Sequence, residues 1–163
     1  MTTEWITRLA DDERKRDAVR SGQREAAARK ADLVHRLGRQ LIDDLRAIVT
    51  HDLDVFRSEF PGDRARGVIF ESEAEGGFVV RKPGPPAASL TVAPRWDLAA
   101  VGCRYSFTSD NGLPARHDAF ELVLVPYGDD TARFKHDGAG LVFTTAGTLS
   151  EYLLTPVLTG RPR

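Results

Sequence analysis

Large apolar residues between Ala31 and Phe56 recur at steps of three and four, which is the spacing of one face of an α-helix. The predicted stripe consists of Leu33, Val34, Leu37, Leu41, Leu45, Ile48, Leu53 and Phe56, and only the steps Leu33–Val34 and Ile48–Leu53 depart from this spacing. The pair Pro61-Gly62 comes after this stretch and is typical of a helix end. The pattern therefore predicts an amphipathic helix whose apolar face must lie against another element.

A helix-forming composition extends back to the N-terminus, since residues 1–60 lack proline and are rich in Ala, Arg, Leu, Asp and Glu. Gly22 is the one weak point. It can close a first helix, or it can lie within a continuous helix at a cost of about 1 kcal/mol. Two helices and one long helix are both compatible with the sequence, and in either case residues 1–60 form an N-terminal helical arm.

From residue 66 onward, short runs of β-forming residues alternate with Gly-, Pro- and Asp-rich turns. In one run, Val101, Cys103 and Tyr105 share one face of a strand, with polar residues between them. Short connections favour antiparallel neighbours in a meander. The expected strands are residues 66–73, 78–82, 88–96, 101–109, 117–126, 131–136 and 141–145.

The end of the chain predicts a short helix, because Thr148 and Glu151 fit a capping box, and Pro156 strains or ends that helix. The fold class is therefore α+β: a long N-terminal helical arm packs on a six- to seven-strand antiparallel meander, with a short C-terminal helix. The regions 1–60 and 61–163 together form one globular domain. A pleckstrin-homology-like barrel with an N-terminal helical extension is the alternative, since it has the same order of elements.

The length of the arm raises a second question. The stretch from Ala31 to Phe56 is about 38 Å long as a helix, and six or seven strands span about 24–29 Å. The sheet can cover this stretch but not the preceding thirty residues, which must fold back or project. Trp5, Ile6 and Leu9 cluster near the N-terminus and are candidate anchors. They dock either on the same domain or on another subunit.

Charge and composition exclude several classes of protein. The net charge is −1, so bulk electrostatics do not favour nucleic acid. No apolar run is long enough to span a membrane, and no signal peptide is expected. Cys103 is the only cysteine, which excludes an internal disulfide and the common zinc cages. The missing signal peptide and membrane span predict a cytoplasmic protein, and the excess of arginine over lysine, with abundant alanine, indicates a GC-rich and hence bacterial genome.

Candidate catalytic groups are sparse. Two His-Asp pairs, His117-Asp118 and His136-Asp137, lie at strand ends and could support acid–base chemistry. No serine or cysteine has the context of a nucleophile. His51 and Asp54 share a helix face but need further ligands to hold a metal. We therefore expect no catalytic residue, no metal and no cofactor, and an enzyme that uses the two His-Asp pairs is only the second alternative.

The polar face of the sheet is the remaining candidate surface. Its basic residues are expected on the side away from the helix, with Glu71 and Glu121 as compensating charges; they are Arg81, Arg95, Arg104, Arg133 and Lys135. They form either a solvated, salt-bridged face or a shallow surface for an acidic peptide or a phosphate headgroup. Single-stranded nucleic acid is disfavoured because no row of aromatic residues lies between the arginines.

The function predicted from these observations is a non-catalytic interaction module. It associates with itself or with a protein partner through the helical arm. The alternative is a protein that binds a small ligand, phosphate or lipid headgroup, either on the basic sheet face or in a cavity between sheet and helix.

Overall fold

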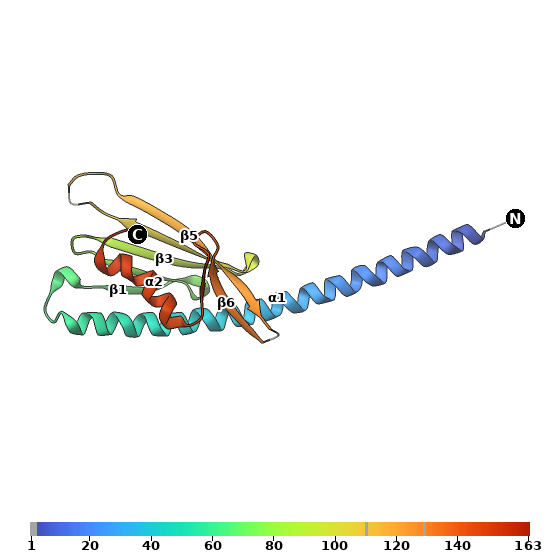
Figure 1. Ribbon diagram of the computed structural model, residues 1–163, viewed down its shortest axis with the longest axis horizontal. Coiled ribbons are helices and arrows are strands. Elements are labelled where there is room, and N and C mark those ends of the chain that lie inside the picture. The colour runs from blue at the N-terminus through green and yellow to red at the C-terminus, as the bar shows by residue number, and fades with distance from the viewer. Residues whose placement is uncertain (1–2, 110, 129) are drawn as a thin grey trace.

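The computed structural model describes residues 3–109, 111–128 and 130–163. A long N-terminal helix, α1 (Glu4–Glu59), and a C-terminal helix, α2 (Ala146–Thr159), flank a seven-stranded antiparallel sheet in the chain (Figure 1). The sheet is open, because its strands follow chain order from β1 at one edge to β7 at the other. The α+β prediction is confirmed, and the pleckstrin-homology-like barrel is wrong.

All seven expected strands are present among the described residues, and two of them have the predicted bounds. The strands are β1 (Ile69–Ser72), β2 (Phe78–Lys82), β3 (Ala88–Arg95), β4 (Ala100–Phe107), β5 (Arg116–Tyr127), β6 (Thr131–His136) and β7 (Leu141–Phe143). A short 3-10 turn, η1 (Arg64–Arg66), leads from α1 to β1, and two more, η2 (Ala74–Gly76) and η3 (Trp96–Leu98), connect β1 to β2 and β3 to β4. The period-two alternation of the sequence therefore located the sheet.

Helix α1 is one continuous helix of 56 residues that passes through Gly22. At 1.5 Å per residue it is about 84 Å long, and its first half extends away from the sheet (Figure 1). Its buried residues all lie in the second half, the first of them being Gly38. Of the two arrangements that the sequence allowed, the single helix is correct.

The second half of α1 covers one face of the sheet. Ile42, Leu45, Val49 and Leu53 are at most 1% exposed and share one core with the inner sheet face. Helix α2 packs beside α1 and adds Leu149, Leu153, Leu154 and Val157 to the same core. Leu37, Leu41 and Ile48 lie at the edge of this contact and are partly buried. The predicted contact between helix and sheet is confirmed, but the buried row includes Ile42 and Val49, which the predicted stripe omitted.

Helix α2 begins earlier than the sequence predicted, and at Pro156 the helix continues, which is the first of the two outcomes that the sequence allowed. Its N-cap is Thr145, whose hydroxyl accepts the N–H of Thr148 at 3.1 Å, so the predicted capping box at Thr148 is wrong by one turn. Pro156 lies inside the helix, which continues to Thr159. A proline leaves the carbonyl one turn earlier without a partner. The guanidinium of Arg163 donates to that carbonyl, on Tyr152, and so offsets part of the cost.

Gly22 allows a direct test of the continuous helix. A Cβ at this position meets no atom within 4 Å, and alanine forms helix better than glycine by about 1 kcal/mol. Gly22→Ala should therefore slow amide exchange in the middle of the arm by up to about fivefold. Ala26→Gly is the reverse control and should speed the same exchange. No change in either variant would mean that the helix is interrupted here in solution.

Candidate functional site

The free part of α1, residues 4–30, is the first candidate surface, and we call it the arm. Trp5, Ile6 and Leu9 are 61%, 47% and 50% exposed. They lie on the part of the helix that extends away from the sheet (Figure 1). The interpretation that these anchors dock on their own domain is therefore wrong: a straight, uninterrupted helix carries them away from the body. The other interpretation, docking on another molecule, is not in conflict with this geometry.

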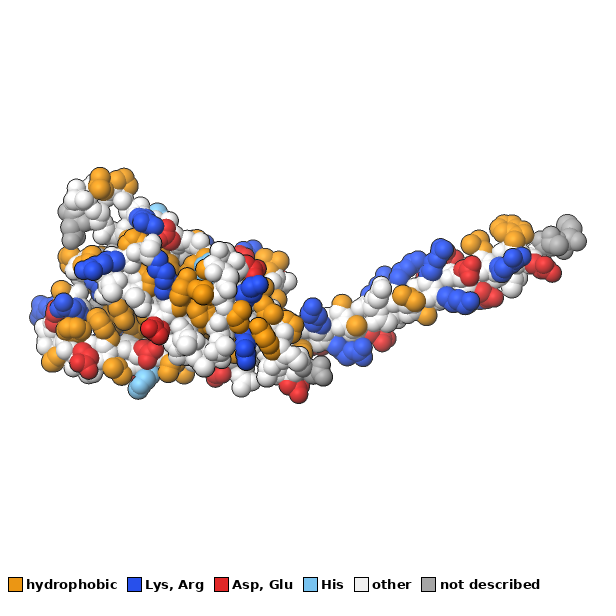
Figure 2. All heavy atoms as spheres, viewed as in Figure 1, with side chains coloured by type: hydrophobic (Ala, Val, Ile, Leu, Met, Phe, Trp, Pro, Cys, Tyr) orange, Lys and Arg blue, Asp and Glu red, His pale blue; other side chains and the backbone are white. Residues whose placement is uncertain are grey.

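The surface of the arm is solvated, because charged side chains cover most of its length. Exposed ion pairs join residues one turn apart: Arg14 with Asp11 at 2.5 Å, Arg16 with Glu13 at 2.9 Å and Arg20 with Asp17 at 3.6 Å. Each pair stabilises a helix by only about 0.3–0.5 kcal/mol. Figure 2 shows charged side chains of both signs along the arm and apolar side chains near its far end. The arm thus has a solvated middle and an apolar tip, which is formed by Trp5, Ile6 and Leu9.

The second candidate surface is the outer face of the sheet, opposite the two helices. The strand register places Thr91, Arg104 and Ala119 side by side across β3, β4 and β5. The same register places the five predicted basic residues on this face. They share the face but are spread over four strands, so they do not form a single cluster.

Most of these cations are already neutralised. Three of them form ion pairs: Arg81 with Glu71 at 2.8 Å, Arg95 with Glu121 at 3.0 Å and Lys135 with Asp137 at 3.3 Å. The guanidinium of Arg133 lies over the ring of Tyr127, 4.5 Å from its centroid. The predicted basic surface is therefore largely an interleaved, solvated face.

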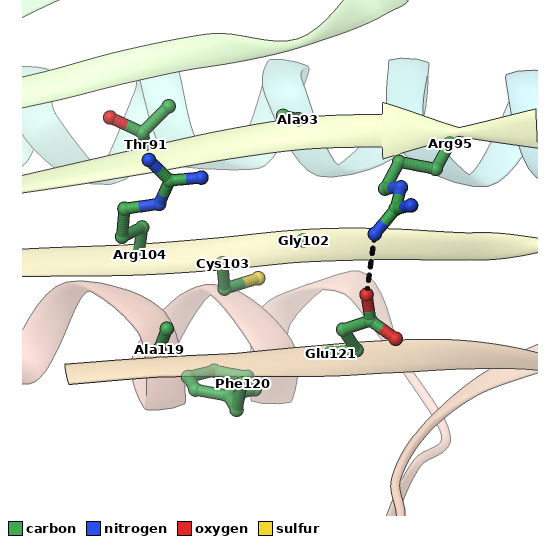
Figure 3. Close-up of a pocket in the computed structure, with 9 residues that line it drawn as sticks. All are labelled: Thr91, Ala93, Arg95, Gly102, Cys103, Arg104, Ala119, Phe120 and Glu121. Carbon is green, nitrogen blue, oxygen red and sulfur yellow. Dashed lines mark hydrogen bonds and ion pairs between the residues drawn. The ribbon is translucent and has the colours of Figure 1, made fainter.

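Arg104 is the exception. Within the described part of the chain its guanidinium has no hydrogen bond and no ion pair. It stands beside a shallow hollow of about 280 Å³ whose floor is made by the small residues Ala93, Gly102 and Ala119. The Arg95–Glu121 pair closes the other end of the hollow (Figure 3). A flat apolar floor beside one free guanidinium can accept a small carboxylate or phosphate.

Sequence reasoning identified Arg104 but missed the hollow. Its floor depends on three small residues from three different strands, which only the register brings together. Alternation along one strand places Gly102 on the polar face, but it carries no information about its cross-strand neighbours. The one available signal was that Ala93, Gly102 and Ala119 have the smallest side chains at expected outward positions.

The two His-Asp pairs do not meet. His117 is exposed on the outer face, where it pairs with Ser106 of β4. His136 lies on the inner face, with its ring stacked on Phe120 at a centroid distance of 4.3 Å. The two imidazoles are therefore on opposite faces of the sheet and cannot act in one pocket. The geometric requirement of the acid–base hypothesis is not met.

Cys103 lies on the inner sheet face and is 1% exposed. Burial raises the pKa of its thiol well above the ordinary value, because the thiolate would be desolvated. We expect no reaction of the folded protein with Ellman's reagent at pH 8, and one thiol per chain after denaturation. Rapid reaction of the native protein would mean that the sheet opens at β4.

Other chemistry finds no support in the part of the chain that the structure describes. No group of three or more His, Cys, Asp or Glu residues there is arranged to hold a metal ion, and this includes His51 and Asp54. Within the same residues, no helix has both the length and the apolar character needed to cross a membrane. The arm and the hollow beside Arg104 are the two candidate surfaces that remain.

Comparison with known proteins assigns this chain to no family. No protein-family model matches the chain, and no curated protein or solved structure is significantly similar to it. The function therefore has to be argued from the geometry of this chain alone.

Proposed function

We propose that this protein is a non-catalytic interaction module that associates, with itself or with another protein, through the arm. The observation that supports it is the exposure of Trp5, Ile6 and Leu9 at the end of a helix that its own sheet does not cover. Single exposed apolar residues are normal on a protein surface. Three within two turns, one of them a tryptophan, are typical of an interface anchor.

The energetics favour association over a permanently free arm. Isolated helices are only marginally stable in water, and most gain their stability from packing. Full burial of an exposed large apolar side chain contributes about 1.5–3 kcal/mol. The arm therefore gains both order and burial when its tip contacts a partner. The same proposal includes a bacterial cytoplasmic setting; the free, buried thiol supports the reducing compartment.

Sedimentation equilibrium across a concentration series tests self-association, the first form of this proposal. The wild-type protein should form a reversible dimer. The double variant Trp5→Ala, Leu9→Ala should dissociate at concentrations at least about 100-fold higher, because a symmetric dimer loses each side chain twice. Leu113→Ala removes an equally exposed residue outside the arm and should change nothing. A wild-type monomer at every concentration, or an equal effect of Leu113→Ala, would contradict self-association through the arm.

A second candidate function is binding of a small anion on the outer sheet face. The observation that favours it is the free guanidinium of Arg104 beside the hollow. Inorganic phosphate should then raise the melting temperature, and Arg104→Glu should abolish this shift. Arg81→Glu is the matched control, since Arg81 is already paired with Glu71. Equal shifts in the wild type and in Arg104→Glu would exclude the site.

A further inference from the structure

One stripe of α1 has the spacing of a coiled-coil seam. Steps of four and three residues, repeated from the tip to the point where α1 meets the sheet, select Trp5, Leu9, Asp12, Arg16, Val19, Gln23, Ala26, Lys30, Leu33 and Leu37. Both ends of this seam are apolar. Between them, an acid lies nearer the tip and a base nearer the body. Parallel and antiparallel pairing along the seam therefore bring different charges into contact.

We propose that residues 5–37 of α1 from two copies of this chain pair antiparallel along this seam, so that the tip of each arm lies on residues 33–37 of the other copy. The inference rests on the proposed function and names its partner. Trp5 then lies opposite Leu37 of the second copy, and Leu9 lies opposite Leu33. Asp12 lies opposite Lys30. By symmetry each contact occurs twice.

Charge distribution selects this direction. Residues 4–13 contain four acidic and one basic side chain, whereas residues 29–38, which they face in the antiparallel register, contain three basic and one acidic one. Parallel pairing would place acid on acid and base on base, with Asp12 facing Asp12 and Lys30 facing Lys30. Antiparallel pairing places the acidic residues 4–13 against the basic residues 29–38 of the second copy. Like charges in direct contact are destabilising and opposite charges stabilising, so the antiparallel arrangement is preferred.

The part of α1 just after the arm, residues 33–37, offers an apolar surface for the tip of a second copy. Leu33, Val34 and Leu37 lie where α1 reaches the sheet, and each is only partly buried there. Val34 and Leu37 already contact the core, so a partner's tip would extend an existing apolar contact. The paired segment is about 50 Å long. Antiparallel pairing places the two folded bodies at opposite ends of this rod, where they do not collide.

The seam also limits the strength of the dimer. Its middle is polar, and four positions along one flank are basic: Arg8, Lys15, Arg29 and Arg36. In the proposed register, Arg8 approaches Arg36 of the second copy, and Lys15 approaches Arg29. These contacts offset part of the apolar gain. We therefore expect a Kd of about 1–100 µM, and not the tight association of an uninterrupted apolar zipper.

A charge swap tests the register. Asp12→Lys and Lys30→Glu should each raise the dimer Kd about tenfold, because each converts two attractive contacts into repulsive ones. The double variant should restore the wild-type Kd. Residues 12 and 30 are about 27 Å apart in one helix, so restoration cannot arise within a chain. Glu25→Lys and Arg24→Glu lie off the seam and are the matched controls. A double variant that stays as weak as the singles would overturn the proposed register.

Cysteine crosslinking tests the direction independently. Leu9→Cys and Leu33→Cys, mixed and mildly oxidised, should give a disulfide-linked heterodimer, while neither variant alone should crosslink. The buried Cys103 does not interfere. Crosslinking of Leu9→Cys to itself would show parallel arms, which overturns this inference and leaves the proposed function intact. A strict wild-type monomer overturns both this inference and self-association.

Discussion

Leu45→Ala should lower the free energy of unfolding by about 2–5 kcal/mol, the usual cost of removing a large side chain from a closed core. Leu45 is 1% exposed between α1 and the sheet, and it belongs to the row of α1 residues that fills the shared core. The loss arises from both the missing burial and the cavity that remains. Urea unfolding, monitored by circular dichroism at a concentration where the protein is monomeric, measures it.

Val19→Ala is the control on the same helix. Val19 lies in the arm and is 59% exposed, so its truncation should change the unfolding free energy by less than about 0.5 kcal/mol. Equal destabilisation by the two substitutions would mean that the arm is packed as firmly as the second half of α1. Division of the helix into an anchored half and a free half would then be wrong.

Gly160→Ala should destabilise the fold by about 2–4 kcal/mol, from backbone strain and overpacking together. Gly160 ends α2 with a φ of +66°, a conformation that residues with a Cβ adopt at a cost. A Cβ there would also overlap the carbonyl oxygen of Pro86. The substitution therefore forces the C-terminus of α2 away from the loop between β2 and β3.

Gly140→Ala separates these two causes. Gly140 has nearly the same φ, +67°, but a Cβ at this position meets nothing within 4 Å. It should carry only the conformational cost of about 1–2 kcal/mol. If the two alanine variants unfold at the same urea concentration, the contact between Gly160 and Pro86 contributes nothing to stability.

Sequence periodicity predicted most of the fold because each element repeats a simple rule. The stripe through Leu45 and Leu53 predicted the buried face of α1, and alternation around Cys103 predicted the inner face of β4. Helix ends were less predictable, since they depend on single contacts. Thr145 caps α2 one turn before the predicted capping box. Arg163, which follows the helix, donates to the Tyr152 carbonyl that Pro156 leaves without an N–H partner.

The candidate site was harder to predict because it depends on distance across the fold. The sequence identified Trp5 and Arg104 as residue types suited to binding. It could not show that α1 is straight enough to carry Trp5 away from the body, since Gly22 permits both a break and a continuous helix. Nor could it show that Arg104 has neither an ion pair nor a ring contact among the described residues, because the ion pairs of its neighbours depend on strand register.

Amide hydrogen exchange along α1 at two protein concentrations tests the central claim most directly. At a concentration below the dimer Kd, amides near Val49 should be protected to the level of global unfolding, while amides of residues 10–30 should exchange orders of magnitude faster. Above the Kd, protection of residues 10–30 should rise, with no change near Val49. Strong protection of the arm at both concentrations, or weak protection at both, would contradict a free arm that becomes ordered when two copies associate.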